Sequence, residues 1–337
     1  MTAIPAEFAA YVAEKVDRDG VASVERGVRP FREADLPVGE VEVRVEWSSV
    51  NYKDGLATRV DGKVARISPL IPGIDLAGEV IASTDPSIGV GAKVLAHGYE
   101  IGVSRHGGYT PYQRLPAGWV VPLAPGLTPR DAMSIGTAGF TAAMSVIALE
   151  ERGLTPSDGP VLVTGASGGV GGTALAILAE RGYEVWAATG KPDEAARLTG
   201  LGAAGILSRD EVTAEGKPLE SERWAGAVDA VGGATLPYVL RTLRIGGAVA
   251  SSGNAGGPAL ATTVFPFILR GVALLGMDSV NMPIDRRRWT WDRLATDLRP
   301  RELGVHCQEV TLDTLDAALD AIVAGQARGR WIVRIAG

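Results

Sequence analysis

The sequence predicts a two-domain α/β protein that combines a β-rich domain, built as an irregular barrel, with a doubly wound parallel sheet. Three observations support this prediction. Short apolar runs separated by Pro and Gly recur up to about residue 125, as in an irregular barrel or sandwich. From Pro160 onward, strand-like runs alternate with helix-like runs, which favours a parallel sheet. A glycine-rich loop, VTGASGGVGGTA, stands between the first such strand and its helix.

The first domain is expected to consist mainly of β-strands. The segments FAAYVAEK and VASVERGV flank DRDG, whose terminal Asp-Gly is typical of a hairpin turn. Residues 41–45 alternate Val with charged residues, which predicts a half-buried strand. The later strands of this domain are separated by Pro69, Pro72, Gly73, Gly89, Gly91, Gly107 and Gly108.

A helical segment is predicted between the β-rich part and the strand–helix repeats. Asp131 opens an Ala- and Met-rich stretch that favours a helix. A break is expected at Gly136-Thr137 and Gly139, and a second helical run ends at Gly153.

The second domain repeats a strand–helix pattern. Its first strand and helix are VLVT and TALAILAERG, the next pair is YEVWAAT and PDEAARLTGLG, and GILS is a third strand. Later strands are expected at WAGAVDAVGG, GGAVASSG and VALLGMD. The tail contains an amphipathic helix, LDTLDAALDAIVAG, and a final strand, GRWIVRI, which is expected to return to the first domain. The predicted domains are therefore 1–125 with 300–337, and 126–299.

Composition argues against several classes of function. The chain has 337 residues, a net charge of −6 and a pI near 5.3, which argues against nucleic-acid and anionic-membrane partners. Its single cysteine, Cys307, permits no intrachain disulfide and excludes a zinc site of several cysteines. His97, His106 and His306 do not cluster at metal-ligand spacing, so no metal is predicted.

The same features predict a cytoplasmic protein. Low cysteine usage fits a reducing compartment, and no signal peptide is expected at the start of the chain. No apolar run is expected to be long enough to span a membrane, and the best candidate, VFPFILRGVALLGM, is interrupted by Pro266 and Arg270.

The glycine-rich loop has the context of a dinucleotide-binding motif. Gly165, Gly168 and Gly171 are three residues apart, with a strand before them and a helix after them. Glycine lets the backbone approach a pyrophosphate, and the helix N-terminus supplies N–H donors and partial positive charge. The spacing is GxxGxxG rather than GxGxxG, and a tight turn that binds nothing is the alternative.

The end of the second strand predicts which dinucleotide is bound. An NAD site usually has Asp or Glu there, to bond the ribose 2′-hydroxyl. This strand ends in Thr189-Gly190-Lys191, and no acid lies between Glu184 and Asp193. A hydroxyl and a cation suit a 2′-phosphate, so NADPH is the predicted cofactor, with Arg209 as a second cation. For both cations, an exposed and solvated side chain is the alternative.

Together these features resemble the medium-chain dehydrogenase/reductase superfamily. The similarity to its acrylyl-CoA reductase (NADPH) group, in the quinone-oxidoreductase-like branch, is carried by WSSVNYKD, IPGIDLAG, GTAGFTA, TGASGGVG and TVFPFILRGVALLGMDSV. The resemblance implies a GroES-like catalytic domain, a Rossmann domain and a zinc-independent reductase. It also implies a homodimer in which sheets join edge to edge, with VALLGMDSV as the edge strand.

The resemblance further implies a set of cofactor-binding positions. These are Tyr52, Thr137, Ser167, Gly168, Gly169, Val170, Thr189, Gly190, Lys191, Arg209, Gly253, Asn254 and Ser279. The loop 252–254 would run past the nicotinamide, and the segment 277–279 would close beside it.

The implied reaction is hydride transfer from NADPH to the β-carbon of an α,β-unsaturated thioester. The thioester oxygen then needs a hydrogen-bond donor, and the α-carbon needs a proton. Tyr52 is the candidate donor, because a neutral phenol just after a strand can face a cleft. A structural Tyr, or one that only lines the nicotinamide, is the alternative. Arg330 is the second catalytic candidate, with a solvated arginine as its alternative.

Three functions remain open at this point. The first is an acrylyl-CoA reductase that forms propionyl-CoA, and the second is a reductase of quinones or small enones. The third is an NADPH-binding protein without turnover, such as a sensor or a crystallin-like module. For an acyl-CoA substrate, the run Arg286–Arg288 is a hypothetical site for the CoA phosphates, although charge runs are usually solvated helix faces.

Overall fold

The computed structural model describes residues 3–301, 303–304 and 307–335, which divide into two compact units. Unit 1 comprises 1–137, 280–295 and 303–337, and unit 2 comprises 138–279 and 296–302. The segments 126–137 and 280–295 therefore belong to unit 1, outside the predicted limits of the first domain. The domain limits remain a prediction.

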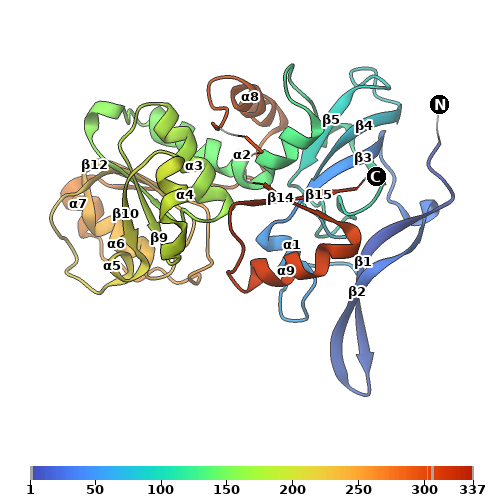
Figure 1. Cartoon of the computed structure of the whole chain (residues 1–337), viewed down its shortest axis with the longest axis horizontal. Helices are drawn as coiled ribbons and strands as arrows, with labels where there is room; N and C mark the ends of the chain where they lie inside the picture. Colours follow the sequence, from blue (N-terminus) through green and yellow to red (C-terminus); the bar gives the residue numbers. More distant parts are fainter. Residues whose placement is uncertain (1–2, 302, 305–306, 336–337) are drawn as a thin grey trace. The chain divides into compact units, whose positions relative to one another are not determined.

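Unit 1 begins with a long β-hairpin. Strands β1 (Glu7–Arg18) and β2 (Val21–Arg32) pair antiparallel along their full length, which confirms the predicted hairpin. Asp19 and Gly20 form its two-residue turn. Their φ angles of 54° and 80° are both positive, as a type I′ hairpin turn requires. The half of β1 near Phe8 is buried, whereas the half near the turn is exposed. In Figure 1 the hairpin, in dark blue, extends away from the other strands of unit 1.

The main sheet of unit 1 has seven strands. In the order β14-β15-β3-β4-β5-β7, with β6 paired to β3, these are β14 (Cys307–Thr311), β15 (Arg330–Arg334), β3 (Val41–Ser49), β4 (Asp75–Ser83), β5 (Lys93–His97), β7 (Val120–Pro122) and β6 (Tyr112–Leu115). The last strand pairs antiparallel with β3, which places Ile332 opposite Ser49 and confirms that the tail returns to the first part of the chain. Strand β14 was not predicted.

Within the described residues, unit 1 also contains three helices. They are α1 (Tyr52–Ala57), α8 (Ile284–Ala295) and α9 (Leu315–Val323), with single 3₁₀ turns at Glu33–Asp35, Ala117–Trp119 and Leu312–Thr314. Helices α1 and α9 pack closely, because a Cβ on Gly55 would lie only 2.4 Å from the Val323 side chain. The buried face of α9 includes Leu315 and Leu319, as its amphipathic pattern predicts.

Helix α2 (Pro129–Glu151) carries the predicted break. Gly136 has φ 55° and ψ −166°, which is not helical, so two helical runs meet there. By length and composition α2 is apolar enough to cross a membrane, which corrects the expectation that no run is long enough. Its most apolar window is 89% buried within the structure, as in the core helix of a soluble protein.

Unit 2 is a parallel sheet with helices between its strands, as predicted. In the order β10-β9-β8-β11-β12-β13, the strands are β10 (Ala203–Ser208), β9 (Val185–Thr189), β8 (Val161–Thr164), β11 (Trp224–Asp229), β12 (Leu243–Ser251) and β13 (Ala273–Gly276). The helices are α3 (Gly169–Glu180), α4 (Ala195–Gly200), α5 (Arg209–Thr213), α6 (Thr235–Thr242) and α7 (Phe265–Arg270), with 3₁₀ turns at Pro156–Asp158 and Pro192–Glu194. The strand order reverses between β8 and β11, and ligands of such sheets bind at the carboxyl ends of the strands beside this reversal.

His106 is a buried structural residue of unit 1. Its Nδ1 accepts the Ile71 N–H at 3.1 Å, and its ring lies edge-on to Phe31 at 4.9 Å. Burial and the nearby Arg105 charge lower the pKa of His106 to about 4. His97 is also buried, and His306 lies outside the described residues.

The pKa of His106 predicts a loss of stability in mild acid. The unfolded imidazole titrates near 6.5, so this contribution is present above pH 6.5 and is lost as the pH falls towards 4, by up to about 3 kcal/mol. The free energy of unfolding of the wild type should therefore fall more steeply between pH 7 and 5 than that of His106→Gln. Urea unfolding at both pH values measures this difference, and parallel curves for the two proteins would contradict the assignment.

Candidate active site

The glycine-rich loop of unit 2 forms a cradle at the carboxyl end of β8. Gly165 adopts φ 58°, which favours glycine, and a Cβ on Gly171 would lie 2.5 Å from the Gly165 carbonyl oxygen. Helix α3 starts at Gly169 with Gly168 as its N-cap, and no side chain caps it. Its first N–H groups therefore need other partners, and a pyrophosphate is a group that such N–H donors bind. The geometry fits the predicted dinucleotide.

The predicted 2′-phosphate residues meet at the end of β9. The Thr189 hydroxyl donates to Ser167 Oγ at 3.1 Å, and the Lys191 N–H donates to Thr189 Oγ1 at 3.1 Å. A Cβ on Gly190 would lie 2.4 to 2.6 Å from three guanidinium atoms of Arg209, so this guanidinium lies against Gly190. The Arg209 guanidinium and the residue Lys191 thus lie beside a strand end that carries no acid, an arrangement that suits a 2′-phosphate.

The loops after β11 and β12 lie at the same edge of the sheet. They pack backbone to backbone, because a Cβ on Gly253 would lie 1.9 Å from the Ala230 carbonyl oxygen. The Gly256 N–H donates to the Val231 carbonyl at 2.8 Å and joins the two loops. Asn254 is exposed beside Gly253, and Ser279 is half-buried beyond β13.

Asp229 ties these strand ends together, and sequence analysis missed it. Its buried carboxylate accepts hydrogen bonds from Thr164 Oγ1 at 2.6 Å, Ser251 Oγ at 3.2 Å and the Gly232 N–H at 3.0 Å. One side chain therefore connects β8, β11 and β12. An Asp that ends a buried strand before two glycines was the signal in the sequence.

Tyr52 lies at the first position of α1 in unit 1. Asn51 and Asp54 form a capping box that fixes where this helix begins. The Tyr52 side chain is 38% exposed, and within the described part of the chain its hydroxyl has no hydrogen-bond partner. A neutral phenol in this state is able to donate to a ligand, so a buried structural Tyr is not what the geometry shows.

A buried polar network lies directly behind Tyr52. The Asp75 carboxylate accepts hydrogen bonds from Ser49 Oγ at 2.7 Å, from Asn51 Nδ2 at 3.0 Å and from the N–H and hydroxyl of Thr137, both at 2.9 Å. Arg330 completes the network, with Nη2 2.7 Å from Ser49 Oγ and Nη1 3.3 Å from Asn51 Oδ1. Arg330 is only 9% exposed, so the alternative of a solvated arginine is wrong.

Asp54 is an acid with an unusual environment in this network. It is fully buried, and burial and the charge of Asp75 raise the pKa of Asp54 to about 7. Its carboxylate accepts N–H bonds from Asn51 at 2.9 Å and Ile74 at 2.8 Å. Asp54 therefore fastens the first turn of α1 to the segment before β4, and through α1 it holds Tyr52.

In the arginine run on α8 the middle residue, Arg287, is not part of a solvated face, whereas Arg286 and Arg288 are half-buried. Arg287 is fully buried and donates to the carbonyls of His97 at 2.8 Å and Val280 at 3.0 Å. The Trp291 indole N–H donates to His97 Nε2 at 2.9 Å, and burial holds the pKa of His97 well below its usual range. Arg287 is thus an internal anchor of unit 1 and is not available to a substrate.

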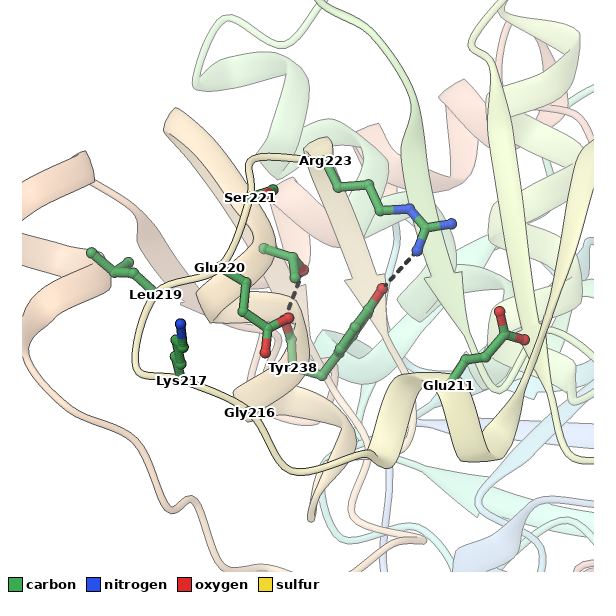
Figure 2. Close-up of a pocket in the computed structure, with 9 residues that line it drawn as sticks. Glu211, Gly216, Lys217, Leu219, Glu220, Ser221, Arg223 and Tyr238 are labelled. Carbon is green, nitrogen blue, oxygen red and sulfur yellow. Dashed lines mark hydrogen bonds between the residues drawn. The ribbon is translucent and has the colours of Figure 1, made fainter.

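A hollow in unit 2 is lined at one end by Arg223 and Tyr238. Figure 2 shows its lining, where Arg223 points at Tyr238 and donates to its hydroxyl at 3.2 Å. Arg223 directly precedes β11, which places this end of the hollow at the amino edge of the sheet. The glycine-rich loop lies at the carboxyl edge.

No metal site accompanies these groups in the described residues. Among 3–301, 303–304 and 307–335, no three His, Cys, Asp or Glu side chains gather closely enough to hold an ion.

The chain matches two family models and is similar along its full length to several known proteins. Residues 37–125 match the alcohol dehydrogenase GroES-like domain, and residues 169–296 match the family described as zinc-binding dehydrogenase. The acrylyl-CoA reductase AcuI of Ruegeria pomeroyi is 49% identical over 97% of this chain and 99% of its own. The yhdH oxidoreductase of Salmonella enterica, crystallised with NADP, has a TM-score of 0.94 and 48% identity, covering 98% of this chain and all of that one.

A third relative carries a different name. It is the "Putative quinone oxidoreductase YhfP" of Bacillus subtilis, 46% identical over 97% of this chain and 99% of its own. Its crystal structure, which has NAD bound, has a TM-score of 0.93.

Proposed function

The chain belongs to the acrylyl-CoA reductase family of the medium-chain dehydrogenase/reductase superfamily, and from this membership we propose that it reduces the C=C bond of acrylyl-CoA to give propionyl-CoA, with NADPH as the reductant. The full-length identity of 49% to the Ruegeria enzyme carries the proposal. The cations at the end of β9 support NADPH as the cofactor.

The residues of unit 2 bind and orient the cofactor in this proposal. The first turn of α3, with Ser167 to Val170, contacts the pyrophosphate, and Thr189 to Lys191 with Arg209 contact the 2′-phosphate. Gly253, Asn254 and Ser279 line the nicotinamide. When bound, NADPH supplies the hydride for the β-carbon of the substrate.

The residues of unit 1 stabilise charge on the substrate. Tyr52 donates a hydrogen bond to the thioester oxygen, where negative charge builds up, and Thr137 contributes to the wall of the site. We assign Arg330 to positioning, because its guanidinium bonds Ser49 and Asn51, which lead into Tyr52. It fixes the strand end from which the phenol projects.

Turnover assays test the proposed function directly. The purified protein is given NADPH with acrylyl-CoA, and in parallel with a soluble quinone and a small enone, while NADH serves as the control cofactor. Fast oxidation of NADPH by acrylyl-CoA alone is expected. Turnover of the quinone alone would instead indicate a quinone reductase, the activity in the name of the Bacillus relative. Binding of NADPH without any turnover would leave the non-catalytic function.

The Tyr52→Phe variant tests the proposed donor. Loss of one hydrogen bond to a developing oxyanion typically costs about 10²-fold in kcat, so we expect kcat for acrylyl-CoA to fall by about that factor with little change in the KM for NADPH. Tyr99→Phe is the control, because the Tyr99 hydroxyl bonds the Met282 carbonyl inside unit 1. An unchanged kcat in Tyr52→Phe would remove Tyr52 from the chemistry.

We also propose that the enzyme is a cytoplasmic homodimer joined through β13. This strand ends the sheet of unit 2, and its Leu274 is exposed. The preceding helix α7 exposes Phe265, Ile268 and Leu269. An uncovered strand edge beside apolar side chains favours pairing with a second copy. Sedimentation equilibrium should give the mass of two chains, and the mass of one chain would refute the dimer.

A further inference from the structure

Two cofactor-facing segments of unit 2 are joined by a closed ring of hydrogen bonds. One segment is the glycine-rich loop at Ser167, and the other runs from Thr189 to Lys191. The first half of the ring joins them directly: the Thr189 hydroxyl donates to Ser167 Oγ at 3.1 Å, and the Lys191 N–H donates to the Thr189 hydroxyl at 3.1 Å.

The second half of the ring passes through two side chains that no sequence motif indicated. The Glu194 N–H donates to the Lys191 carbonyl at 3.0 Å. The Glu194 carboxylate then accepts Arg197 Nε at 2.6 Å, and Arg197 Nη2 donates to the Ser167 carbonyl at 3.2 Å. The ring thus returns to the residue from which it started.

The ion pair in this ring is largely buried and is specific to arginine. The side chains of Glu194 and Arg197 are 8% and 19% exposed. Arg197 uses Nε for Glu194 and Nη2 for Ser167, two donors that a rigid guanidinium holds at fixed spacing. The single ammonium of a lysine does not reproduce this arrangement.

The position of Arg197 is electrostatically costly unless an anion lies nearby. Its Nη1 is 3.8 Å from where a Cβ on Gly172 would be, so the guanidinium lies against the first turn of α3. The N-terminus of a helix already carries partial positive charge. Glu194 offsets part of this repulsion, and a bound phosphate would benefit from the remaining positive potential.

We propose that Arg197, held by Glu194, is a positioning residue for cofactor selectivity: it fixes Lys191 and the glycine-rich loop relative to one another, so that the 2′-phosphate and the pyrophosphate are met at the same time. The inference rests on the proposed function only for the identity of the cofactor. NADH lacks the 2′-phosphate and gains less from this placement of Lys191.

Calorimetric binding of NADPH and NADH to Arg197→Lys tests the proposal without any acyl-CoA. The Kd for NADPH should rise about tenfold, as expected for weakening one charge-assisted hydrogen bond, while the Kd for NADH changes less than about threefold. Arg181→Lys is the matched control, because Arg181 forms a similarly shielded pair with Glu150 at the far end of α3. It should leave both Kd values unchanged.

A second variant keeps the test decisive if Arg197→Lys does not fold. Glu194→Gln preserves size and the Arg197 side chain, and it should lower the ratio of NADH to NADPH Kd by about threefold. Equal weakening of both cofactors, or none, in the folded variants would overturn the proposal. Selective NADPH binding by a protein that does not reduce acrylyl-CoA would refute the proposed function and leave this inference standing.

Discussion

Replacement of Gly136 by alanine should destabilise unit 1 by about 3–5 kcal/mol. The backbone at Gly136, with φ 55° and ψ −166°, is essentially open to glycine alone. A Cβ there would also lie 2.2 Å from Arg330 Nη2 and 2.8 Å from Ser49 Oγ. Both atoms belong to the buried network around Asp75, so relief of the clash would break hydrogen bonds between buried polar groups.

Thermal and urea unfolding measure this effect, with Gly91→Ala as the matched control. Gly91 also has a positive φ, of 85°, but its missing Cβ would meet nothing within 4 Å. The control therefore reports the cost of a Cβ at a positive φ without a clash, about 1 kcal/mol. The excess in Gly136→Ala reports the clash together with the strain of the unusual ψ angle at that position. Equal losses in the two variants would show that the network tolerates the methyl group.

Removal of both cations near Gly190 should abolish the preference for NADPH. A hydrogen bond to a charged phosphate contributes about 1.5–3 kcal/mol. Lys191→Ala/Arg209→Ala, which removes two such contacts, should therefore lower kcat/KM for NADPH by about 10²- to 10⁴-fold. The value for NADH should change by less than about threefold, because NADH offers these cations no phosphate at the 2′ position.

Steady-state kinetics with both cofactors measure this change in the ratio of kcat/KM for NADPH to kcat/KM for NADH. Lys217→Ala/Arg223→Ala is the control, since it removes the same net charge from the hollow of Figure 2, where Arg223 marks the amino edge of the sheet. The control variant should change kcat/KM for NADPH only slightly. A parallel fall for NADPH and NADH in the test variant would mean that the cations support the loop rather than the 2′-phosphate.

The order of elements could be predicted because it depends on local signals. The Asp-Gly turn at 19–20, the break at Gly136 and the strand–helix alternation after Pro160 are each determined by neighbouring residues, and the structure confirms them. The cofactor cradle could be predicted for the same reason, because its glycines and the end of β9 lie within about thirty residues of one another in the sequence.

The buried network could not be predicted in this way. The hydrogen bond between Arg330 and Ser49 joins residues 281 positions apart, and the pattern around each gives no sign of the other. Arg287 shows the same limit, because three adjacent arginines suggest a solvated face and only the packed fold reveals a buried anchor. Glu194 and Arg197 are three residues apart, but only tertiary structure shows that their pair reaches Ser167.

The pairing of β15 with β3 also constrains how the chain matures on the ribosome. Unit 2 uses one long continuous segment, 138–279, and it adds only 296–302. Unit 1 needs β15 opposite Ser49, so β3 leaves the exit tunnel long before residues 330–334, with which it pairs. Until then β3 has an open edge where β15 will pair, and a nascent chain at this stage exposes that edge to pairing with other chains.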